Sequence, residues 1–277
     1  MQTKLMIMFT RTPLHVGAGA SVGAIDLPVI RERHTKFPVI PGSAIKGVLA
    51  DEFLTDDKKR TEIGKKIFGE EDPFAEAKSG SISFGEARLL AFPLRSARGA
   101  FALATCPLAL ARFARDAGLS LAVPSVGDAK SLAGNDLILD NKKVALEEYV
   151  FSCQGDFPDE WAEKLSSLLE DVVLKEARTR FVLLSDGDFL HFAVNACQVQ
   201  HHNRINDQTG VVDTGALFNV ETVPSETLFY APLTVIRKSD ATEKLLEKFG
   251  SEMLLQFGGK STTGLGFCTV KLSEVNK

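Results

Sequence analysis

Residues 12–41 read TPLHVGAGASVGAIDLPVIRERHTKFPVIP, and this stretch limits the folds that the chain can adopt. Its thirty residues include three glycines and four prolines, and they show no sustained helical period. Irregular segments of this length are rare inside compact domains, where they are usually functional or disordered. Because apolar residues are frequent in this stretch, we expect an ordered loop that serves the function of the protein.

The segments on either side of this loop have clear periods. Lys4–Arg11 places Leu5, Ile7 and Phe9 on one face, with polar residues entering at its end, which predicts a half-buried β-strand. Pro41, Gly42 and Ser43 predict the start of a helix, with Ser43 as its N-cap and Lys46 in its first turn. One face of this helix is apolar, at positions Ile45, Leu49 and Phe53.

Farther along the chain, strands and helices interleave without the regular repeat of a doubly wound sheet. Apolar runs predict strands at 81–96, 143–146, 181–184, 229–237 and 265–272. Helical spacing predicts helices at 106–118, 156–172, 189–197 and 245–258, and part of 51–80 is also expected to be helical. Residues 198–218 are typical of a long polar hairpin with Gly210 in its turn. We expect an α+β fold with a small antiparallel sheet, helices on one face and several long insertions.

The composition is that of an ordinary globular protein. Of 277 residues, 44% are hydrophobic and 25% are charged, which excludes collagen-like, coiled-coil and wholly disordered chains. No apolar run approaches the roughly 20 residues that cross a bilayer, and the N-terminal segment lacks the pattern of a signal peptide. The four cysteines are far apart in the sequence, which indicates buried free thiols. We therefore expect a cytoplasmic protein with no membrane partner, built as one large domain or two small ones.

Charge is distributed unevenly along the chain. The net charge is −4, yet residues 1–50 carry six basic and two acidic side chains, a net of +4 that leaves −8 for the rest. This basic segment is either a solvated face or an electropositive groove for a phosphate chain.

Two glycine motifs imitate nucleotide-binding loops. GAGASVG at 17–23 has Val22 where a dinucleotide-binding loop needs glycine, and GGKST at 258–262 has Leu254 where a P-loop needs one. Neither activity is expected. The second loop can still present backbone N–H groups and a lysine to phosphate, or it can be a simple helix-to-strand turn. The residues concerned are Gly258, Gly259, Lys260, Gly264 and Gly266.

The runs Leu14–Leu49 and Leu255–Val270 (LQFGGKSTTGLGFCTV) together resemble the RAMP superfamily, the repeat-associated RNA-binding proteins of CRISPR–Cas systems. Within that superfamily, Arg31–Gly47, Phe84–Ser96 and Arg204–Tyr230 are similar to the repeating backbone subunit of the type III-B Cmr effector complex. The resemblance runs from end to end. The type III-A backbone subunit shares the architecture, so the subtype rests on the runs Arg31–Gly47 and Arg204–Tyr230.

The resemblance implies a ferredoxin-like, RNA-recognition-type core with a projecting thumb-like β-hairpin. It predicts one domain over 1–277, with insertions at about 12–41, 51–80, 118–150 and 198–226. Copies of such a subunit stack as a helical filament along a CRISPR guide RNA, together with other Cmr-complex subunits. Apolar residues near the hairpin tip would unstack one base per subunit, and the candidates are Val211, Val212 and Leu217.

The implied activity is metal-dependent endonucleolytic cleavage of the complementary single-stranded target RNA at regular intervals. We place the catalytic function at Asp26, the only acidic residue among the first 31, on a glycine-flanked loop. The carboxylate could hold a hydrated Mg²⁺ or Mn²⁺, act as a base, or orient another group. His15 is a second catalytic candidate, as a proton donor or phosphate ligand, and Glu221 and Glu226 are further ones.

Guide-RNA contacts are expected to be independent of sequence, because base pairing reads the target in RNA-guided systems. The helix start near Lys46 and the preceding basic loop offer charge beside free N–H donors. The expected contacts are Arg31, Arg33, Lys36, Ser43 and Lys46, in addition to the glycine loop. Two alternatives stay open: a non-catalytic scaffold of the same fold, and an unrelated small-molecule enzyme that uses the N-terminal glycine loop.

Overall fold

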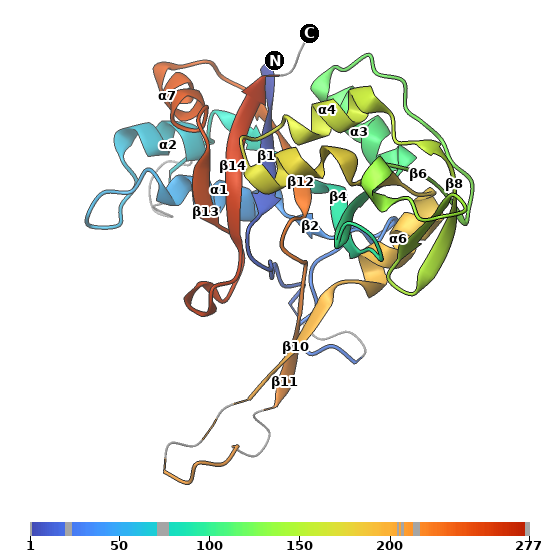
Figure 1. Cartoon of the computed structure of the whole chain (residues 1–277). Coiled ribbons are helices and arrows are strands. Elements are labelled where there is room, and N and C mark those ends of the chain that lie inside the picture. The colour runs from blue at the N-terminus through green and yellow to red at the C-terminus, as the bar shows by residue number, and fades with distance from the viewer. Residues whose placement is uncertain are drawn as a thin grey trace.

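A computed structural model of the protein describes residues 2–19, 24–70, 78–203, 205, 208–212 and 217–274. A rounded body carries a sheet and its helices, and a two-stranded hairpin projects from one end of it (Figure 1). Both chain termini lie at the opposite end (Figure 1). Among the described residues, no helix is long and apolar enough to cross a membrane.

Twelve strands of the described chain form one mixed sheet, whose path runs β13-β14-β1-β12-β4-β5-β9-β6-β8-β7, with β2 on β4 and β3 on β12. The strands are β1 (Gln2–Thr10), β2 (Val39–Ile40), β3 (Ile82–Phe84), β4 (Ala87–Arg95), β5 (Phe101–Thr105), β6 (Lys130–Ala133), β7 (Lys143–Leu146), β8 (Tyr149–Asp156), β9 (Phe181–Leu183), β12 (Leu228–Val235), β13 (Met253–Gln256) and β14 (Phe267–Glu274). β5 pairs with β9, and β6 with β8, in parallel. The expectation of a small antiparallel sheet is therefore wrong.

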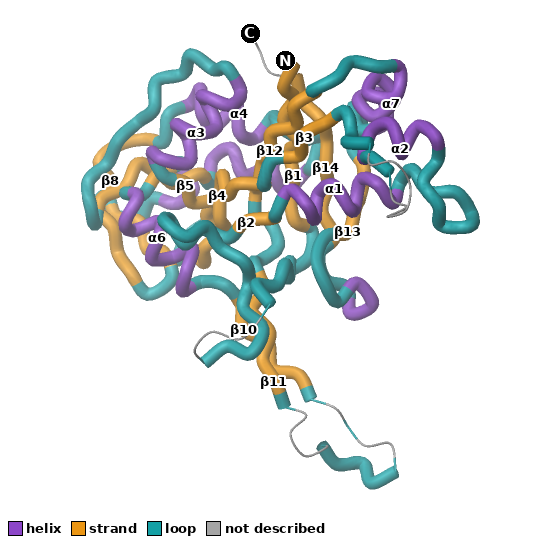
Figure 2. The backbone as a smooth tube through the Cα atoms, turned by 180° about the vertical axis from the view of Figure 1, so that it is seen from behind, coloured by secondary structure: helices purple, strands orange, loops and turns teal. Residues whose placement is uncertain are grey.

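Helices pack on both faces of this sheet (Figure 2). They are α1 (Gly42–Asp51), α2 (Glu62–Phe68), α3 (Pro107–Ala117), α4 (Asp159–Ser166), α5 (Val172–Glu176), α6 (Asp186–Asn195) and α7 (Asp240–Lys248). One apolar cluster joins α1, α2, α6 and α7 to one face, and a second joins α3, α4 and α5 to the other. The prediction of helices on a single face is therefore also wrong.

Strand β1 explains this difference. Met6 and Met8 belong to the first cluster, whereas Leu5, Ile7 and Phe9 belong to the second, so both faces of the strand are buried. The prediction of a half-buried strand is wrong, because the positions on its second face are methionines, which are as apolar as their neighbours. A strand that is buried on both sides reads as a continuous apolar run, which is typical of the centre of a sheet covered on both faces.

Several predicted elements are confirmed. β1, β9 and β14 lie where apolar runs predicted strands, and α3 ends at Gly118, whose φ of 64° is the left-handed cap conformation. α6 begins after Ser185, whose side chain accepts a hydrogen bond from the Asp188 N–H.

Other predicted boundaries are wrong. α1 begins one residue before Ser43, so Pro41 is the N-cap and no side chain caps the helix. The helix predicted over 156–172 ends at Ser166, and Val172 starts the separate α5 with 67% of its surface exposed. Met253 starts β13 instead of continuing α7. In 118–150, one strand was expected, whereas β6, β7 and the start of β8 lie there.

Candidate active site at the base of the hairpin

The hairpin that projects from the body is formed by β10 (Gln198–His202) and β11 (Phe218–Thr222). These strands form a separate two-stranded sheet, so the predicted hairpin exists, but its return strand is 218–222 and lies almost wholly beyond the expected range 198–218. Gly210 near the tip has a φ of 69°, which suits glycine. The predicted apolar tip residues are exposed, namely Val211, Val212 and Leu217, and residues 213–216 lie outside the described part.

Asp26 lies on the irregular loop, where that loop runs beside β11 at the base of the hairpin. Its backbone N–H donates to Asn219 Oδ1 at 2.8 Å, and the Asn219 N–H donates to Asp26 Oδ2 at 2.8 Å. Asn219 Nδ2 also donates to the Ala24 carbonyl at 3.1 Å. We call this pair of reciprocal bonds the Asp26–Asn219 clamp. Asp26 is exposed, and its Oδ1 makes no hydrogen bond to a described residue.

Two residues along the same strand, Glu221 is buried with 4% of its surface exposed. Its Oε1 lies 2.5 Å from Arg31 NH2, and its Oε2 accepts the Val29 N–H at 2.9 Å. Arg31 also donates to the carbonyls of Lys36 and Ala193, at 2.9 and 2.7 Å. Because both side chains have their polar atoms engaged inside the protein, this geometry anchors the loop and leaves neither group facing an RNA strand.

Cys197 lies against this ion pair, with its sulfur 3.3 Å from Arg31 NH2. Burial raises the pKa of the Cys197 thiol to about 11, although the nearby guanidinium opposes the shift. All four cysteines are free, as predicted from their spacing. A protonated thiol at this position acts as a small apolar group with a weak polar contact.

His15 lies under the same loops and is 7% exposed. Its Nδ1 is 2.7 Å from the Glu221 carbonyl oxygen. Because a carbonyl can only accept, Nδ1 carries the proton, and in the neutral ring Nε2 is left as an acceptor. A Cβ on Gly17 would lie 3.1 Å from Nε2, so the glycine loop passes close to that nitrogen.

The second glycine loop, between β13 and β14, packs against His15. Gly258 has a φ of 76°, and a Cβ there would lie 2.1 Å from the His15 carbonyl oxygen, so only glycine fits. The N–H groups of Gly259, Gly264 and Gly266 donate to carbonyls within the protein. The expectation that these three glycines present free N–H groups to phosphate is therefore wrong, because the loop uses those donors to hold its own shape.

Lys260 is the part of this loop that reaches the hairpin. Its Nζ lies 4.9 Å from the centre of the Phe218 ring, and the His202 ring stacks on the same ring at 5.4 Å. Phe218 directly precedes Asn219, so this cation and two stacked rings adjoin the Asp26–Asn219 clamp. A cation beside stacked aromatic rings is the combination that binds single-stranded nucleic acid.

The remaining predicted contacts lie farther from the clamp. Arg33 and Lys36 are exposed on the loop before β2, Ser43 is exposed in the first turn of α1, and Lys46 is half-buried as the fifth residue of that helix. Glu226 lies apart, in a pocket with Arg11 and other acidic residues.

A divalent ion at Asp26 can be tested against the residues around it. In the part of the chain that the structure describes, no three His, Cys, Asp or Glu side chains are grouped so that they could hold a metal ion. Magnesium is commonly held by one or two carboxylates, while water and substrate phosphate complete its octahedral shell. The residues fit an ion that is shared with a phosphate group, and Asp26 would hold it through Oδ1.

Asn219 and Phe218 were missed in the sequence analysis. Asparagine is depleted in strands, so Asn219 between Phe218 and Val220 was the available signal of a special position. No single-sequence signal connects it with Asp26, which lies far away along the chain.

A family model described as the RAMP superfamily matches residues 10–269. The chain is 35% identical, over an alignment 291 positions long, to the CRISPR system Cmr endoribonuclease Cmr4 of Pyrococcus furiosus, and the alignment covers 99% of this chain and 97% of that protein. Over 39 residues, 13% of this chain and 18% of the relative, it is 51% identical to the CRISPR system Cms endoribonuclease Csm3 of Enterococcus italicus.

Solved structures agree with these sequence matches. The crystal structure of oligomeric Cmr4 from Pyrococcus furiosus superposes with a TM-score of 0.76 at 30% identity, with 100% of both chains covered. A chain in the cryo-EM structure of the type III-B Cmr-beta complex bound to cognate target RNA gives a TM-score of 0.76 at 22% identity, covering 98% of this chain and 96% of that one. The second likeness concerns the fold alone.

Proposed function

The chain belongs to the RAMP superfamily, and from this premise we propose that it is a repeating backbone subunit of a type III-B RNA-guided complex. In this proposal it binds CRISPR guide RNA and cleaves the paired target RNA once per subunit. The likeness to an endoribonuclease over 99% of the chain supports the activity. The observation that carries the site is the exposed Asp26 carboxylate, which is fixed at the base of the hairpin with one oxygen unused.

Cleavage through the neighbouring 2′-hydroxyl requires that hydroxyl to be in line with the phosphorus, and it requires a group that takes its proton. Asp26 has the chemistry for this role, because the clamp uses Oδ2 and leaves Oδ1 toward solvent. The clamp also keeps the loop backbone from moving relative to β11. A bound Mg²⁺ or Mn²⁺ would supply charge stabilisation on the phosphate at this carboxylate.

Guide binding in this proposal uses groups that read the RNA backbone. Lys46, Arg33, Lys36 and Lys260 supply positive charge, and the exposed Ser43 supplies a hydroxyl. Arg31 and Glu221 hold the loop instead of contacting RNA, since their polar atoms are already bonded. His15 would act through Nε2 if substrate binding opens the glycine loops around it.

In this proposal the hairpin is the thumb-like hairpin that the resemblance predicts. Its exposed apolar residues Val211, Val212 and Leu217 would enter the base stack and separate one base per subunit. A ferredoxin-like core would place neighbouring copies so that these wedges recur along the guide. Partners are therefore guide RNA, target RNA, further copies of the chain and the other subunits of the complex.

The test is target-RNA cleavage by the assembled, guide-loaded complex in Mg²⁺ or Mn²⁺, with wild type compared with Asp26→Asn. We expect the regularly spaced cuts to fall by at least about 100-fold, in line with the loss of a positioned acid–base group. Guide and target affinities should stay the same. Glu226→Gln is the matched control, because Glu226 lies in a different pocket. Unchanged cutting by Asp26→Asn would instead favour the non-catalytic scaffold.

A further inference from the structure

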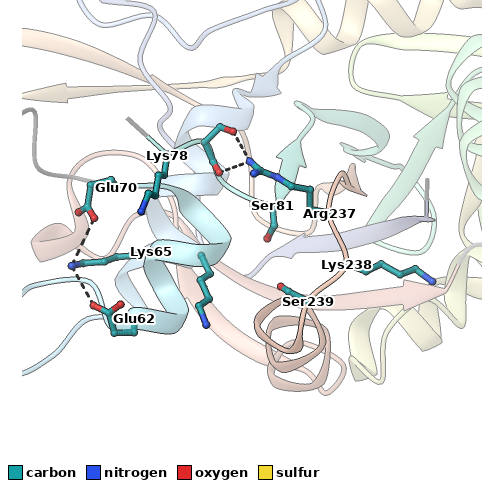
Figure 3. Close-up of a pocket in the computed structure, with 10 residues that line it drawn as sticks. Glu62, Lys65, Glu70, Lys78, Ser81, Arg237, Lys238 and Ser239 are labelled. Atoms are coloured by element: carbon teal, nitrogen blue, oxygen red, sulfur yellow. Dashed lines mark hydrogen bonds and ion pairs between the residues drawn. The ribbon is translucent and has the colours of Figure 1, made fainter. Parts of the chain in front are cut away.

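A second site lies on the part of the body away from the hairpin. Helix α2, the segment 78–81 and the connection between β12 and α7 enclose a pocket of about 670 Å³ (Figure 3). This volume is within the range of cavities that bind small molecules, roughly 300–1,000 Å³. The pocket shares no lining residue with the base of the hairpin.

The pocket is strongly basic for an acidic protein. Among the residues that the structure describes, its lining contains five cationic and two acidic side chains, a net of +3 in a chain of net charge −4. The cations are Lys65, Lys66, Lys78, Arg237 and Lys238, and the acids are Glu62 and Glu70. A concave surface with one dominant sign of charge concentrates counter-ions of the opposite sign.

These charges differ in how they are held. Lys65 lies between the two acids, 3.3 Å from Glu62 Oε1 and 3.8 Å from Glu70 Oε2, so the acids are directed at one lysine (Figure 3). Arg237 is fixed through NH2, which donates to the Ser79 carbonyl at 2.7 Å and to the Ser79 hydroxyl at 2.5 Å. Lys66 and Lys78 are exposed and line the same pocket as this fixed guanidinium.

Ser81 in the pocket wall is an independent sign of a ligand. The residue is only 5% exposed, and its hydroxyl makes no hydrogen bond. Its backbone is held rigidly, because its N–H donates to the Ile67 carbonyl at 2.9 Å and its carbonyl accepts the Ile236 N–H at 2.8 Å. A buried polar group without a partner costs about 1–3 kcal/mol, so native proteins seldom retain one without a reason.

Gly80 shows that this wall is built by close packing. A Cβ at this position would lie 2.3 Å from the Ile67 carbonyl oxygen, so no larger residue fits between the segment and α2. The neighbouring Ser79 forms a bridge to Gly69, whose φ is 95°. The backbone of Ser81 is therefore placed in the pocket wall by the fold.

We propose that this pocket binds the phosphate groups of a small polyphosphate ligand. Arg237, Lys66 and Lys78 supply the charge, and the Ser81 hydroxyl donates the hydrogen bond that it lacks inside the protein. Phosphate oxygens suit these donors, because each phosphate group accepts from several of them at once. The volume leaves room for more than one phosphate group. The proposal does not depend on RNA cleavage at Asp26.

The experiment is calorimetric titration of the full chain with three probes: a nucleoside triphosphate, inorganic tripolyphosphate and the nucleoside alone. We expect both phosphate compounds to bind and the nucleoside not to bind. Tighter binding of the nucleoside triphosphate would identify a nucleotide, and equal binding would identify inorganic polyphosphate. Lys66→Glu with Lys78→Glu should weaken binding at least tenfold. The matched control is Lys130→Glu with Lys143→Glu, two exposed lysines on other strands that make the same change in net charge.

Ser81→Ala separates a ligand role from a structural one. Because the hydroxyl has no partner, its removal should leave the urea midpoint of the free protein unchanged while it weakens tripolyphosphate binding about three- to tenfold. Three results would overturn the proposal: no binding of either phosphate compound at 1 mM, equal weakening by the control pair, or binding of single-stranded RNA in the pocket with no binding of the small probes.

Discussion

One face of β11 holds the irregular loop at two points that differ in exposure. Asn219 and Glu221 are two residues apart, so their side chains lie on the same face, roughly 7 Å from each other. The outer point is the Asp26–Asn219 clamp, which is open to solvent and leaves a carboxylate oxygen unused. The inner point is the Arg31–Glu221 pair, in which the polar atoms are bonded inside the protein.

The difference shows how one strand can serve stability and chemistry together. A buried, fully bonded carboxylate fixes the loop but has no oxygen left for a substrate. The exposed carboxylate adds little to stability, yet its position is set by the rigid inner point two residues away. Both acids are carboxylates at the contact between the loop and β11. Their different roles therefore follow from their exposure and their hydrogen-bond partners.

The largest effect on stability is expected from breaking the inner point. Arg31→Met should lower the free energy of unfolding by about 3–5 kcal/mol, because it leaves the buried Glu221 carboxylate without its cation. Urea unfolding measures this loss. Adding Glu221→Gln should recover part of it, since the uncompensated charge is then removed. A loss below about 1 kcal/mol together with weaker guide binding would instead make Arg31 an RNA contact.

Disrupting the Asp26–Asn219 clamp should slow cleavage and leave the free energy of unfolding nearly unchanged. Asn219→Ala removes the side chain that accepts from the Asp26 N–H and donates to Ala24, so we expect cleavage to slow about tenfold with guide affinity unchanged. The readout is single-turnover cleavage by the assembled complex.

A double variant tests whether Asn219 acts through Asp26. In the Asp26→Asn background, Asn219→Ala should cause no further loss, because the positioned group is already absent. A full additional tenfold loss would show that Asn219 contributes independently of Asp26.

The buried thiol of Cys197, which lies against the Arg31–Glu221 pair, leads us to expect that the free energy of unfolding depends on pH. Burial raises the pKa of Cys197 from 9.0 to about 11, so between these values the unfolded chain releases a proton that the folded protein keeps. This contribution is fully present below pH 9 and is lost as the pH rises toward 11. At pH 10 the loss is about 1.4 kcal/mol. Urea unfolding of wild type and Cys197→Ser at pH 8 and pH 10 measures it, and equal pH slopes would contradict it.

The sequence predicted the elements whose signals are local. The end of α3 at Gly118 depends on neighbouring residues only, and the helix predicted over 106–118 was found to end there. The large two-faced sheet was not predicted, because pairs such as β5–β9 and β1–β12 join segments that are far apart in the sequence. Local periodicity carries no information about such pairing.

The same limit applies to the site. Asp26 stood out in the sequence because it is an isolated acid on a glycine-rich loop. Arg31 and Glu221 were expected near RNA, but 190 residues separate these two partners, and their pairing becomes visible only in the folded chain. A basic or acidic residue in a functional loop is therefore ambiguous until its burial is known.

The smallest effect is expected from a change at Lys260, which lies over the Phe218 ring beside the Asp26–Asn219 clamp. Lys260→Gln should weaken guide-RNA binding only about threefold, since the loop keeps its shape through backbone bonds that do not involve this side chain. The slope of log affinity against log salt concentration should fall by about 0.7, the value for one phosphate contact on a single strand. Lys164→Gln on α4 is the control and should leave the slope unchanged. If Lys260→Gln leaves the slope unchanged too, the lysine stabilises the hairpin base through Phe218, and the outer point then binds RNA through other groups.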